Sequence, residues 1–514
     1  MIMMKRFIFP YAAMLTFGLF MGACAEDEGN YDYTQINEVT IESIEANAVY
    51  EAGSHISITP TITILDEASA NLSYSWTIGE TEVSTERNLD IDLPPLEYGN
   101  QLCALTITDH NNGMQYRKTF TISINNAFNY GYYFLTRTDN GDTELAYIQS
   151  KEDDNATLDD VKYATGIENY SFGKDPVQLF GTYAIRSDGS NIAEWTYYFL
   201  THDADHPGIV TNTTTFTPLY VLNNGSFVDQ AGGYEFNPEC AFTGQGHKST
   251  YFISNGQFIL YTNGKLYRPA QHLQDYYWSH PAAGASMATF AWVFDELSKK
   301  VYTIQAYSAG DEILGVIPNA NAWDKVVEPE DNPVIEEPVI TITDTYGGTH
   351  KGNVFCAAPD GLHIYSFTKT WQKEDPAFVA KNEYPLPNGL DENTAYALGS
   401  TGSANYYLFY NSGNDIYKNY TFNIGAPILV SDKLSALGLG NVEKIAVSAM
   451  GKRLIVVLYD ESSPEERKGS VVFLDINTGE VTHTFPHILH HCVTAFGGND
   501  STSAFGYGIF GDGM

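Results

Sequence analysis

One run of aromatic residues is the best candidate in this 514-residue chain for binding a ligand. Residues 275–281 read Asp-Tyr-Tyr-Trp-Ser-His-Pro. Because successive side chains of a strand point to opposite faces, three consecutive aromatics cannot all face one core. An exposed ring stacks on a sugar or on a peptide side chain, whereas core packing is the alternative for each residue. With two tryptophans in loop-like segments, the candidate ligand-binding residues are Tyr276, Tyr277, Trp278, His280, Trp323 and Trp371.

A second segment could hold a divalent cation, which is the one candidate cofactor. Residues 202–207 read His-Asp-Ala-Asp-His-Pro, so two imidazoles and two carboxylates lie close together in sequence. Both groups ligate divalent metals. A polar loop that ends at Pro207 explains the same residues. The candidate metal ligands are His202, Asp203, Asp205 and His206.

A third cluster contains four histidines within nine residues. They are His483, His487, His490 and His491. Imidazoles at this density can bind a transition metal. His490 and His491 are adjacent, however, and on a strand they would face opposite ways. The pattern therefore favours a histidine-rich turn between two strands.

Catalytic motifs are missing from the sequence. It has no G-x-S-x-G nucleophile elbow and no H-E-x-x-H metalloprotease helix. Turn sequences such as 139–142, Asp-Asn-Gly-Asp, lack the 12-residue span of an EF-hand and fit hairpin reversals. Carboxylates are abundant enough for an acid–base pair, but nothing in the sequence selects one. A hydrolase or lyase stays open as an alternative.

Charge and cysteine usage narrow the choice of partners. The formal net charge is −36, from 63 acidic and 27 basic residues. Such a field repels polyphosphates, and no basic footprint for nucleic acid is present. A cationic ligand or a divalent metal ion is more compatible with this negative charge. Beyond the first 24 residues, the cysteines are widely spaced and predict buried core residues rather than a disulfide framework; they are Cys103, Cys240, Cys356 and Cys492.

The first 36 residues predict export and a lipid anchor. Lys5 and Arg6 precede a short apolar run, 7–21, which is typical of an export signal and too short to span a bilayer. The exit sequence Phe-Met-Gly-Ala-Cys resembles a bacterial lipobox, with Cys24 as the lipidated residue. The acidic residues directly after it resemble the surface-export signal of Bacteroidota lipoproteins. We therefore expect a signal peptide at 1–23 and an acidic tether at 24–36.

Residues 37–126 predict a β-sandwich. Apolar residues alternate cleanly over 55–64, and Trp76 lies at the centre of another short strand candidate. Asn111-Asn112-Gly113 is a hairpin signal between two further strands. Short strands at this spacing around one tryptophan are typical of immunoglobulin-like domains.

Within this segment the resemblance to a known family becomes specific. Residues 74–78 and 105–109, Tyr-Ser-Trp-Thr-Ile and Leu-Thr-Ile-Thr-Asp, are similar to two strand signatures of PKD-type modules. Residues 29–33, Gly-Asn-Tyr-Asp-Tyr, follow the anchor as in the PKD-like family of surface lipoproteins. The resemblance implies an outer-membrane protein that faces the cell exterior. It further implies an accessory role beside SusC/SusD-type importers, capturing peptides or glycans.

Residues 127–514 predict a β-propeller, most simply with seven blades. A strand–turn–strand theme with Gly turns and aromatic strands recurs every 40 to 60 residues or so, which is typical of propeller blades. Two stacked sandwiches are the competing architecture. Residues 503–510 are one more strand candidate, which could close the ring against the first strand after Phe128. The acidic and proline-rich segments 326–333 and 336–338 are expected to be solvated loops.

Together these features predict an all-β, lipid-anchored binding protein with an immunoglobulin-like stalk and a propeller head. It contacts the membrane through its anchor only and does not bind nucleic acid. Two alternatives remain besides capture of peptides or glycans. One is a surface hydrolase or lyase, and the other is an adhesion or scaffold module that binds a partner protein.

Overall fold

The structure is a computed structural model that divides into two compact units. One unit comprises residues 1–95 and 100–123, and the other comprises 96–99 and 124–514. No helix in the described part of the chain is long and apolar enough to cross a membrane. The described residues are 37–45, 48–51, 54–93, 99–125, 131–150, 158–167, 170–185, 193–212, 218–228, 235–243, 250–262, 265–267, 275–283, 290–306, 323–370, 376–400, 406–448 and 452–496.

The N-terminal unit is a β-sandwich built around Trp76. A five-stranded sheet has the order β2-β9-β8-β5-β6, and the pairs β1-β4 and β3-β7 complete the unit. The Trp76 side chain is buried and its Nε1 donates to the carbonyl of Glu86 at 2.9 Å. The alternating pattern of β5 and β8 buries one face of each strand. The strands are β1 (Val39–Glu42), β2 (Ala48–Glu51), β3 (His55–Ile58), β4 (Thr61–Ile64), β5 (Leu72–Ile78), β6 (Thr81–Ser84), β7 (Leu89–Asp92), β8 (Gly99–Asp109) and β9 (Met114–Asn125).

The second unit consists of four-stranded antiparallel sheets, seven of which lie in the described residues. Each sheet is one blade. From the innermost strand outward, blade 1 is β39 (His491–Phe496), β10 (Gly131–Arg137), β11 (Thr143–Ser150) and β12 (Leu158–Ala164); blade 2 is β15 (Pro176–Ile185), β16 (Ala193–Thr201), β17 (Gly208–Asn212) and β18 (Pro218–Leu222); blade 3 is β19 (Pro238–Thr243), β20 (Thr250–Ser254), β21 (Gln257–Thr262) and β22 (Lys265–Tyr267); blade 4 is β23 (Trp278–Ala283), β24 (Phe290–Asp295), β25 (Lys300–Ala306) and β26 (Trp323–Val327).

The later blades follow the same order. Blade 5 is β27 (Val339–Tyr346), β28 (His350–Ala358), β29 (Gly361–Lys369) and β30 (Ala377–Pro385); blade 6 is β31 (Tyr396–Ser400), β32 (Tyr406–Ser412), β33 (Asp415–Tyr420) and β34 (Ile428–Ser431); blade 7 is β35 (Asn441–Val447), β36 (Arg453–Tyr459), β37 (Gly469–Asp475) and β38 (Val481–Leu489). Short elements between blades are β13 (Gly166–Ile167), β14 (Tyr170–Ser171) and the 3₁₀ turns η1 (Asn224–Ser226) and η4 (Leu434–Leu437).

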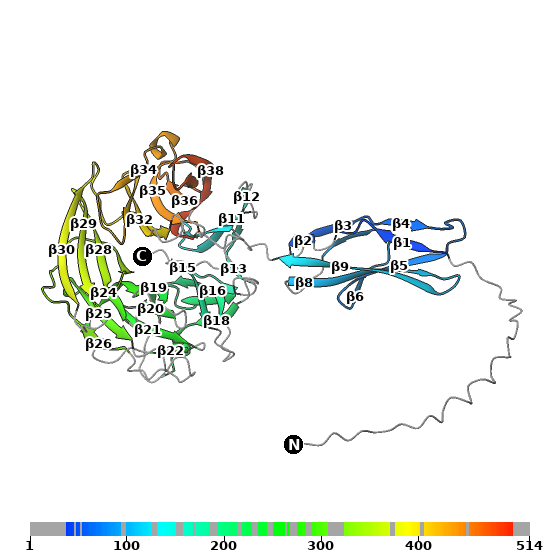
Figure 1. Cartoon of the computed structure of the whole chain (residues 1–514), viewed down its shortest axis with the longest axis horizontal. Helices are drawn as coiled ribbons and strands as arrows, with labels where there is room; N and C mark the ends of the chain where they lie inside the picture. The colour runs from blue at the N-terminus through cyan, green and yellow to red at the C-terminus, as the bar shows by residue number, and fades with distance from the viewer. Residues whose placement is uncertain are drawn as a thin grey trace, which may run out of the picture. The chain divides into compact units, whose positions relative to one another are not determined.

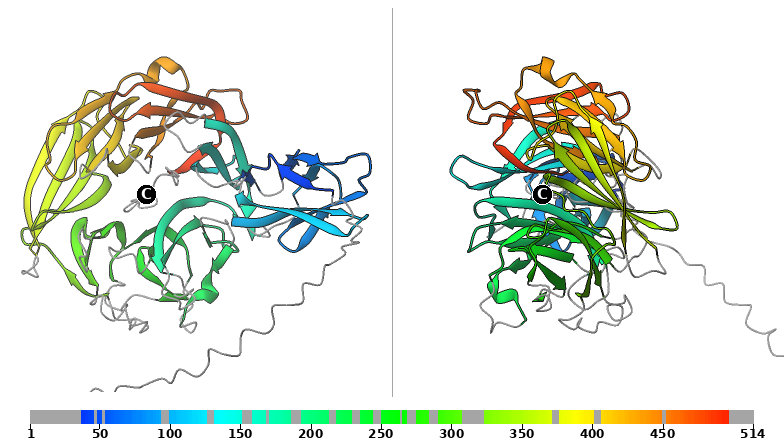
Figure 2. Two further views of the ribbon diagram at one scale, coloured as in Figure 1. Left: turned by 45° about the vertical axis from the view of Figure 1, so that its right-hand side comes forward. Right: turned by 90° about the vertical axis from the view of Figure 1, so that its left-hand side faces the viewer.

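The blades are arranged in a ring (Figure 1), which is a β-propeller. Figure 2 shows the same ring turned by 45°. Hydrophobic clusters lie between every pair of neighbouring blades, including blades 7 and 1. Blade interiors are therefore covered on both faces, which explains why five consecutive residues of β36, Leu454 to Leu458, are apolar and fully buried. The predicted fold class, a PKD-type sandwich followed by a propeller, is confirmed, while the blade count of the whole chain stays a prediction.

Ring closure differs from the sequence-based expectation. The innermost strand of blade 1 is β39, which pairs with β10 and places Phe496 opposite Tyr133. The closing strand is therefore 491–496, and the predicted closing segment 503–510 lies outside the described residues. Arg467, from the loop before β37, reinforces this closure with two hydrogen bonds to Glu144 of blade 1, at 2.8 and 3.3 Å.

The two ends of the propeller are defined by the direction of its innermost strands. Strands β15, β19, β23, β27, β31, β35 and β39 all begin at one end, which we call the near end, and finish at the far end. Because each blade is antiparallel, the loops between second and third strands also lie at the near end. The four cysteines in these units are free and buried, as predicted.

Candidate functional site

A cavity of about 740 Å³ lies at the near end, where blades 6, 7 and 1 meet. Its walls come from the loop before β31, the start of β35, the end of β36 and the start of β39. Because β39 is the ring-closing strand, the cavity forms only when the C-terminal strand is in place. The lining segments are 392–396, 440–445, 459–462 and residue Cys492.

Glu443 is placed beside this cavity by a β-bulge. The register between β35 and β36 shifts between Val442 and Lys444, so Glu443 is the extra residue of β35. Its carboxylate lies 2.8 Å from Nδ1 of His491 and accepts a hydrogen bond from the backbone N–H of Cys492 at 2.9 Å. Burial raises the pKa of Glu443, although both of these contacts act to lower it.

Tyr459 and His491 form an aromatic wall next to this carboxylate. Their rings stack with centroids 3.9 Å apart and planes inclined by 21°. Burial raises the pKa of Tyr459 to about 12, and the charges of Glu461 and Glu443 act in the same direction. Both rings are partly exposed, and Tyr459 lines the cavity while His491 stacks against it.

The cavity is strongly acidic. Four carboxylates line it, against the single ammonium group of Lys444. One of these carboxylates, that of Glu461, also has Lys468 at 3.5 Å. A partly enclosed site of one sign of charge concentrates ligands of the opposite sign. The lining carboxylates are Glu392, Glu443, Asp460 and Glu461.

The predicted aromatic site is mostly core. Trp278 has no exposed surface, stacks on Tyr276 with centroids 4.3 Å apart, and meets the Tyr302 ring edge-on. The prediction that Trp278 contacts a ligand is therefore wrong, because the interface between blades 3 and 4 covers the whole indole. Tyr276 is packed against the same cluster.

Tyr277 is the residue of this run that faces solvent, with 40% of its surface exposed. Its hydroxyl donates to Glu239 at 2.7 Å, and this hydrogen bond together with burial raises its pKa to about 12. The ring lies on Gly256, where a Cβ atom would come within 2.5 Å of it. Tyr277 thus bridges blades 3 and 4, and its binding role stays a prediction.

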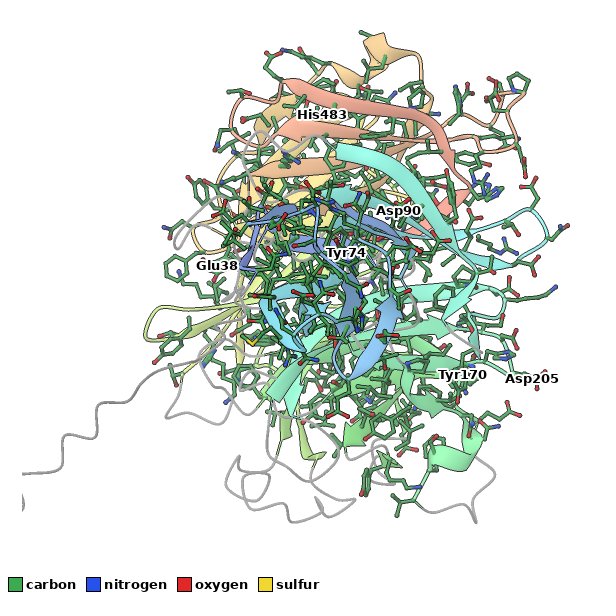
Figure 3. All side chains as sticks on the ribbon, turned by 90° about the vertical axis from the view of Figure 1, so that its right-hand side faces the viewer. Glu38, Tyr74, Asp90, Tyr170, Asp205 and His483 are labelled. Atoms are coloured by element: carbon green, nitrogen blue, oxygen red, sulfur yellow. The ribbon has the colours of Figure 1, made fainter. Side chains whose placement is uncertain are left out.

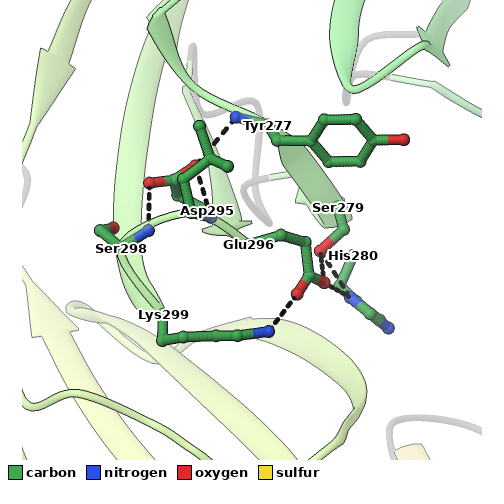
Figure 4. Close-up of polar contacts among 8 residues, drawn as sticks. Tyr277, Ser279, His280, Asp295, Glu296, Ser298 and Lys299 are labelled. Carbon is green, nitrogen blue, oxygen red and sulfur yellow. Dashed lines mark hydrogen bonds and ion pairs between the residues drawn. The ribbon is translucent and has the colours of Figure 1, made fainter.

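His280 belongs to a polar network rather than to an open site (Figure 4). Ser279 donates to Glu296 at 2.7 Å, Lys299 donates to the other oxygen of Glu296 at 2.8 Å, and His280 Nδ1 lies 2.9 Å from the Ser279 hydroxyl. Burial lowers the pKa of His280 to about 4. A hydrolytic triad would need the carboxylate on the histidine, whereas here Glu296 accepts from the serine.

The predicted metal loop has a structural role. Oδ2 of Asp203 accepts from the backbone N–H of Lys174 at 3.0 Å, which fixes the loop that leads into β15. In the same way, the Asp295 carboxylate accepts a hydrogen bond from the backbone N–H of Tyr277 in blade 4, and the Asn411 side-chain oxygen accepts one from the backbone N–H of Ala395 in blade 6. The shared position, at the end of the second strand of a blade, explains why a carboxylate or amide occurs there.

The structure does not bring His202, Asp203, Asp205 and His206 together as a ligand set, and their binding of a metal stays a prediction. Within the described ranges, no group of three or more His, Cys, Asp or Glu residues is placed so that it could hold a metal ion. His202 and Asp205 are exposed, and Asp205 lies at the rim of the ribbon (Figure 3). The closest approach of His206 to Asp203, at 3.8 Å, is a weak ion pair.

The histidine cluster spans β38, the turn after it and the start of β39, so only His490 lies in the turn that the sequence predicted. His483 and His487 lie on β38, and Figure 3 labels His483 on that strand. His491 begins β39 and is the residue that reaches the cavity wall through Glu443 and Tyr459. Sequence reasoning missed it, because its partners lie 32 and 48 residues earlier in the chain and no motif links them.

Three predicted site residues cannot be placed. Cys24 and Trp371 lie outside the described residues. Trp323 begins β26, but its side chain is also outside them.

Comparison with known protein families finds a match in the N-terminal part of the chain, which includes the sandwich and the strands directly after it. Residues 24–169 match the PKD-like family. The match continues past the sandwich through β10, β11 and β12, so the part related to this family includes three strands of blade 1. No curated protein matches the chain.

Solved structures resemble the chain only distantly. One is a quinonprotein alcohol dehydrogenase-like protein from Bacteroides thetaiotaomicron, with 14% identity, a TM-score of 0.39, and coverage of 86% of this chain and 94% of that one. Another is PorZ, an essential surface component of the type-IX secretion system of Porphyromonas gingivalis, with 10% identity, a TM-score of 0.35, and coverage of 70% and 38%. The WD40 domain of SCAP from fission yeast has 8% identity and a TM-score of 0.31, and covers 62% and 88%.

Proposed function

We propose that this protein is a lipid-anchored binding protein of the cell surface whose near-end cavity captures peptides through a cationic group. The observation that carries the proposal is the buried carboxylate of Glu443 in a cavity with four carboxylates and one lysine. An N-terminal amine, a lysine or an arginine of a peptide supplies the missing positive charge. The Tyr459–His491 wall then contacts the adjoining side chain.

The proposed location rests on the N-terminal sequence and on the family match. The lipobox-like exit at Cys24 supplies the anchor, and resemblance to PKD-like surface lipoproteins supplies the role beside an outer-membrane importer. Mass analysis of the mature protein should find lipid on Cys24. Protease added to intact cells should cleave the protein; a bare thiol, or protection in intact cells but not in disrupted ones, contradicts this location.

Calorimetric titration of the chain from residue 25 onward tests the ligand. Tri-lysine should bind, whereas its fully acetylated form and tri-glutamate should not. Glu443→Gln keeps the shape but removes the charge, and should weaken tri-lysine binding by about tenfold or more. The matched control is Glu336→Gln, an exposed near-end glutamate outside the cavity. Equal loss in both variants, or no binding of tri-lysine, contradicts the proposal.

A hydrolase is the second candidate, and one observation favours it. Glu443 combines a pKa raised by burial with a position beside a cavity, which is the environment of a general acid. Mass spectrometry of basic peptides and of glycans after incubation with the protein distinguishes the two functions. Cleavage that Glu443→Gln abolishes favours the enzyme, and intact ligands with retained binding favour capture.

A further inference from the structure

A cluster of exposed aromatic rings lies at the far end of blades 5 and 6. Tyr346 is the last residue of β27 and is 39% exposed, Tyr406 is the first residue of β32 and is 44% exposed, and Phe422 follows β33 and is 40% exposed. Lys351 of β28 is exposed beside them. We refer to Tyr346, Lys351, Tyr406 and Phe422 as the far-end patch.

Contacts between the two blades hold this patch together. The Phe422 ring lies directly on Gly347, where a Cβ atom would come within 2.5 Å of the ring, so only glycine permits the approach. Lys351 Nζ lies 4.9 Å from the centroid of Phe422. Asn353 of blade 5 donates to the carbonyl of Thr421 at 3.0 Å. These contacts fix the Phe422 ring across the two blades. The Tyr346 ring packs on His350, and the Tyr406 carbonyl accepts from the Thr421 N–H at 3.2 Å, while all three rings remain exposed to solvent.

The charge of the patch is the reverse of that of the whole chain. Acidic residues outnumber basic ones by 63 to 27 in the sequence. The segments that form the patch, 345–353, 406–411 and 417–429, contain no aspartate or glutamate. They contribute Lys351, and also Lys418, which lies over the Tyr407 ring at 4.8 Å. Among the described segments that form the patch, an anionic ligand therefore meets two lysines and no carboxylate, whereas four carboxylates line the near-end cavity.

We propose that the far-end patch binds an acidic polysaccharide. The flat faces of aromatic rings match the apolar C–H faces of sugar rings, and such stacking gives a large contact area. A lysine ammonium adjacent to the rings pairs with a carboxylate or sulfate on the sugar. This site is separate from the near-end cavity, which lies at the opposite end of the innermost strands and takes the opposite charge.

Two other classes of ligand would each use only part of the far-end patch. An acidic peptide would use Lys351 but would not need three exposed rings, and a neutral glycan would use the rings but not the lysine. The carboxylate nearest to Tyr346 in the sequence is that of Asp344, which is buried and paired with His350 at 2.8 Å, so the exposed rings and Lys351 together favour an acidic sugar polymer. Both other occupants can be tested directly.

The experiment measures binding of the chain from residue 25 onward to polygalacturonate, alginate and chondroitin sulfate. Dextran serves as the neutral polymer and polyglutamate as the acidic peptide. At least one acidic polysaccharide should bind tenfold or more tightly than both comparison polymers. Failure of all three to bind overturns the proposal, and so does equally tight binding of dextran or of polyglutamate.

Two variants locate the site. Phe422→Ala should weaken the binding of the acidic polysaccharide about tenfold, and Lys351→Gln should weaken it several-fold and reduce its dependence on salt. The matched controls are Tyr170→Ala, an exposed tyrosine of β14, and Lys265→Gln, an exposed lysine of β22. Thermal melts check that all four variants fold. Because Lys351→Gln leaves the ring packing intact, unchanged affinity in that variant overturns the proposal even if Phe422→Ala misfolds. Binding of tri-lysine should be the same in all four variants.

Discussion

Two glutamates of the propeller, Glu337 in blade 5 and Glu443 in blade 7, have opposite electrostatic environments. Glu337 accepts hydrogen bonds from Lys381 at 2.9 Å and from the Tyr365 hydroxyl at 2.9 Å, and lies 3.1 Å from Nδ1 of His363. Burial by itself raises its pKa, but these partners lower it to about 2. Glu443 has one histidine and one backbone N–H, and its pKa is raised.

The number of donors around each carboxylate distinguishes one that stabilises the fold from one that has room to bind a ligand. Glu337 is fully matched by donors from its own blade, so a ligand has no charge to satisfy there. Burial of Glu443 is not fully compensated, and the cationic ligand proposed for the adjoining cavity would offset the remaining cost of burying its charge. The same residue type therefore stabilises the fold at one position and points to binding at the other.

The largest effect is expected from Glu337→Gln. Its pKa of about 2 in the folded state, against 4.5 in the unfolded chain, sets an upper limit of about 3 kcal/mol on its contribution to stability at pH 7, and solvent screening at this partly exposed site reduces the contribution to about 1–2 kcal/mol. Glutamine cannot pair with the charge of Lys381, so the variant should lose about that amount. Chemical denaturation at pH 7 measures the free energy of unfolding, and tri-lysine binding should not change.

The pH dependence of the stability difference between wild type and Glu337→Gln tests whether charge pairing is the cause of the loss. A carboxylate with a lowered folded-state pKa contributes its full stability above pH 4.5 and loses it as the pH falls toward 2. The difference between wild type and Glu337→Gln should therefore shrink to less than roughly half of its pH 7 value at pH 3. A difference that is constant with pH would mean that lost packing, and not charge pairing, is responsible.

Much of the fold could be predicted from the sequence because strands and turns leave local signals. Alternation, Gly turns and aromatic strands located both the sandwich and the propeller. Ring closure was assigned to 503–510 instead of β39, because the pairing of β39 with β10 joins residues more than 350 positions apart and leaves no local mark. Residues 326–333 and 336–338 were expected to be solvated, yet Glu337 in the second of these segments pairs with Lys381 of blade 5. Charged residues and prolines gave no sign of this pairing.

The candidate sites were less predictable. The run 275–281 stood out because its aromatics are consecutive, but consecutive aromatics also suit a strand whose two faces are both covered, as Trp278 shows. The cavity is lined by three separate segments of blades 6 and 7 and by Cys492 of blade 1, which lie far apart in the chain, so no motif marks it. Glu443 depends on a bulge in β35, and a one-residue register shift cannot be read from alternation alone.

Glu443→Gln should affect stability less than Glu337→Gln. Because burial raises the folded-state pKa of Glu443, its charged form opposes folding as the pH rises through that pKa. The amide oxygen can still accept from the Cys492 N–H, and the amide nitrogen can donate to His491. We expect a change within about 1 kcal/mol of wild type, or a slight gain, in the same denaturation experiment. A loss as large as that of Glu337→Gln would place Glu443 among the structural carboxylates.

The smallest effect is expected from His491→Phe. Phenylalanine preserves an aromatic stack on Tyr459, but it removes the hydrogen bond that lowers the pKa of Glu443. Glu443 should then stay protonated to a higher pH, and a protonated carboxyl no longer attracts a cation. Tri-lysine binding should fall only a few-fold at pH 8 and more steeply than in wild type as the pH is lowered to 6. A parallel loss at every pH would instead show that the imidazole contacts the ligand directly and does not act by keeping Glu443 ionised.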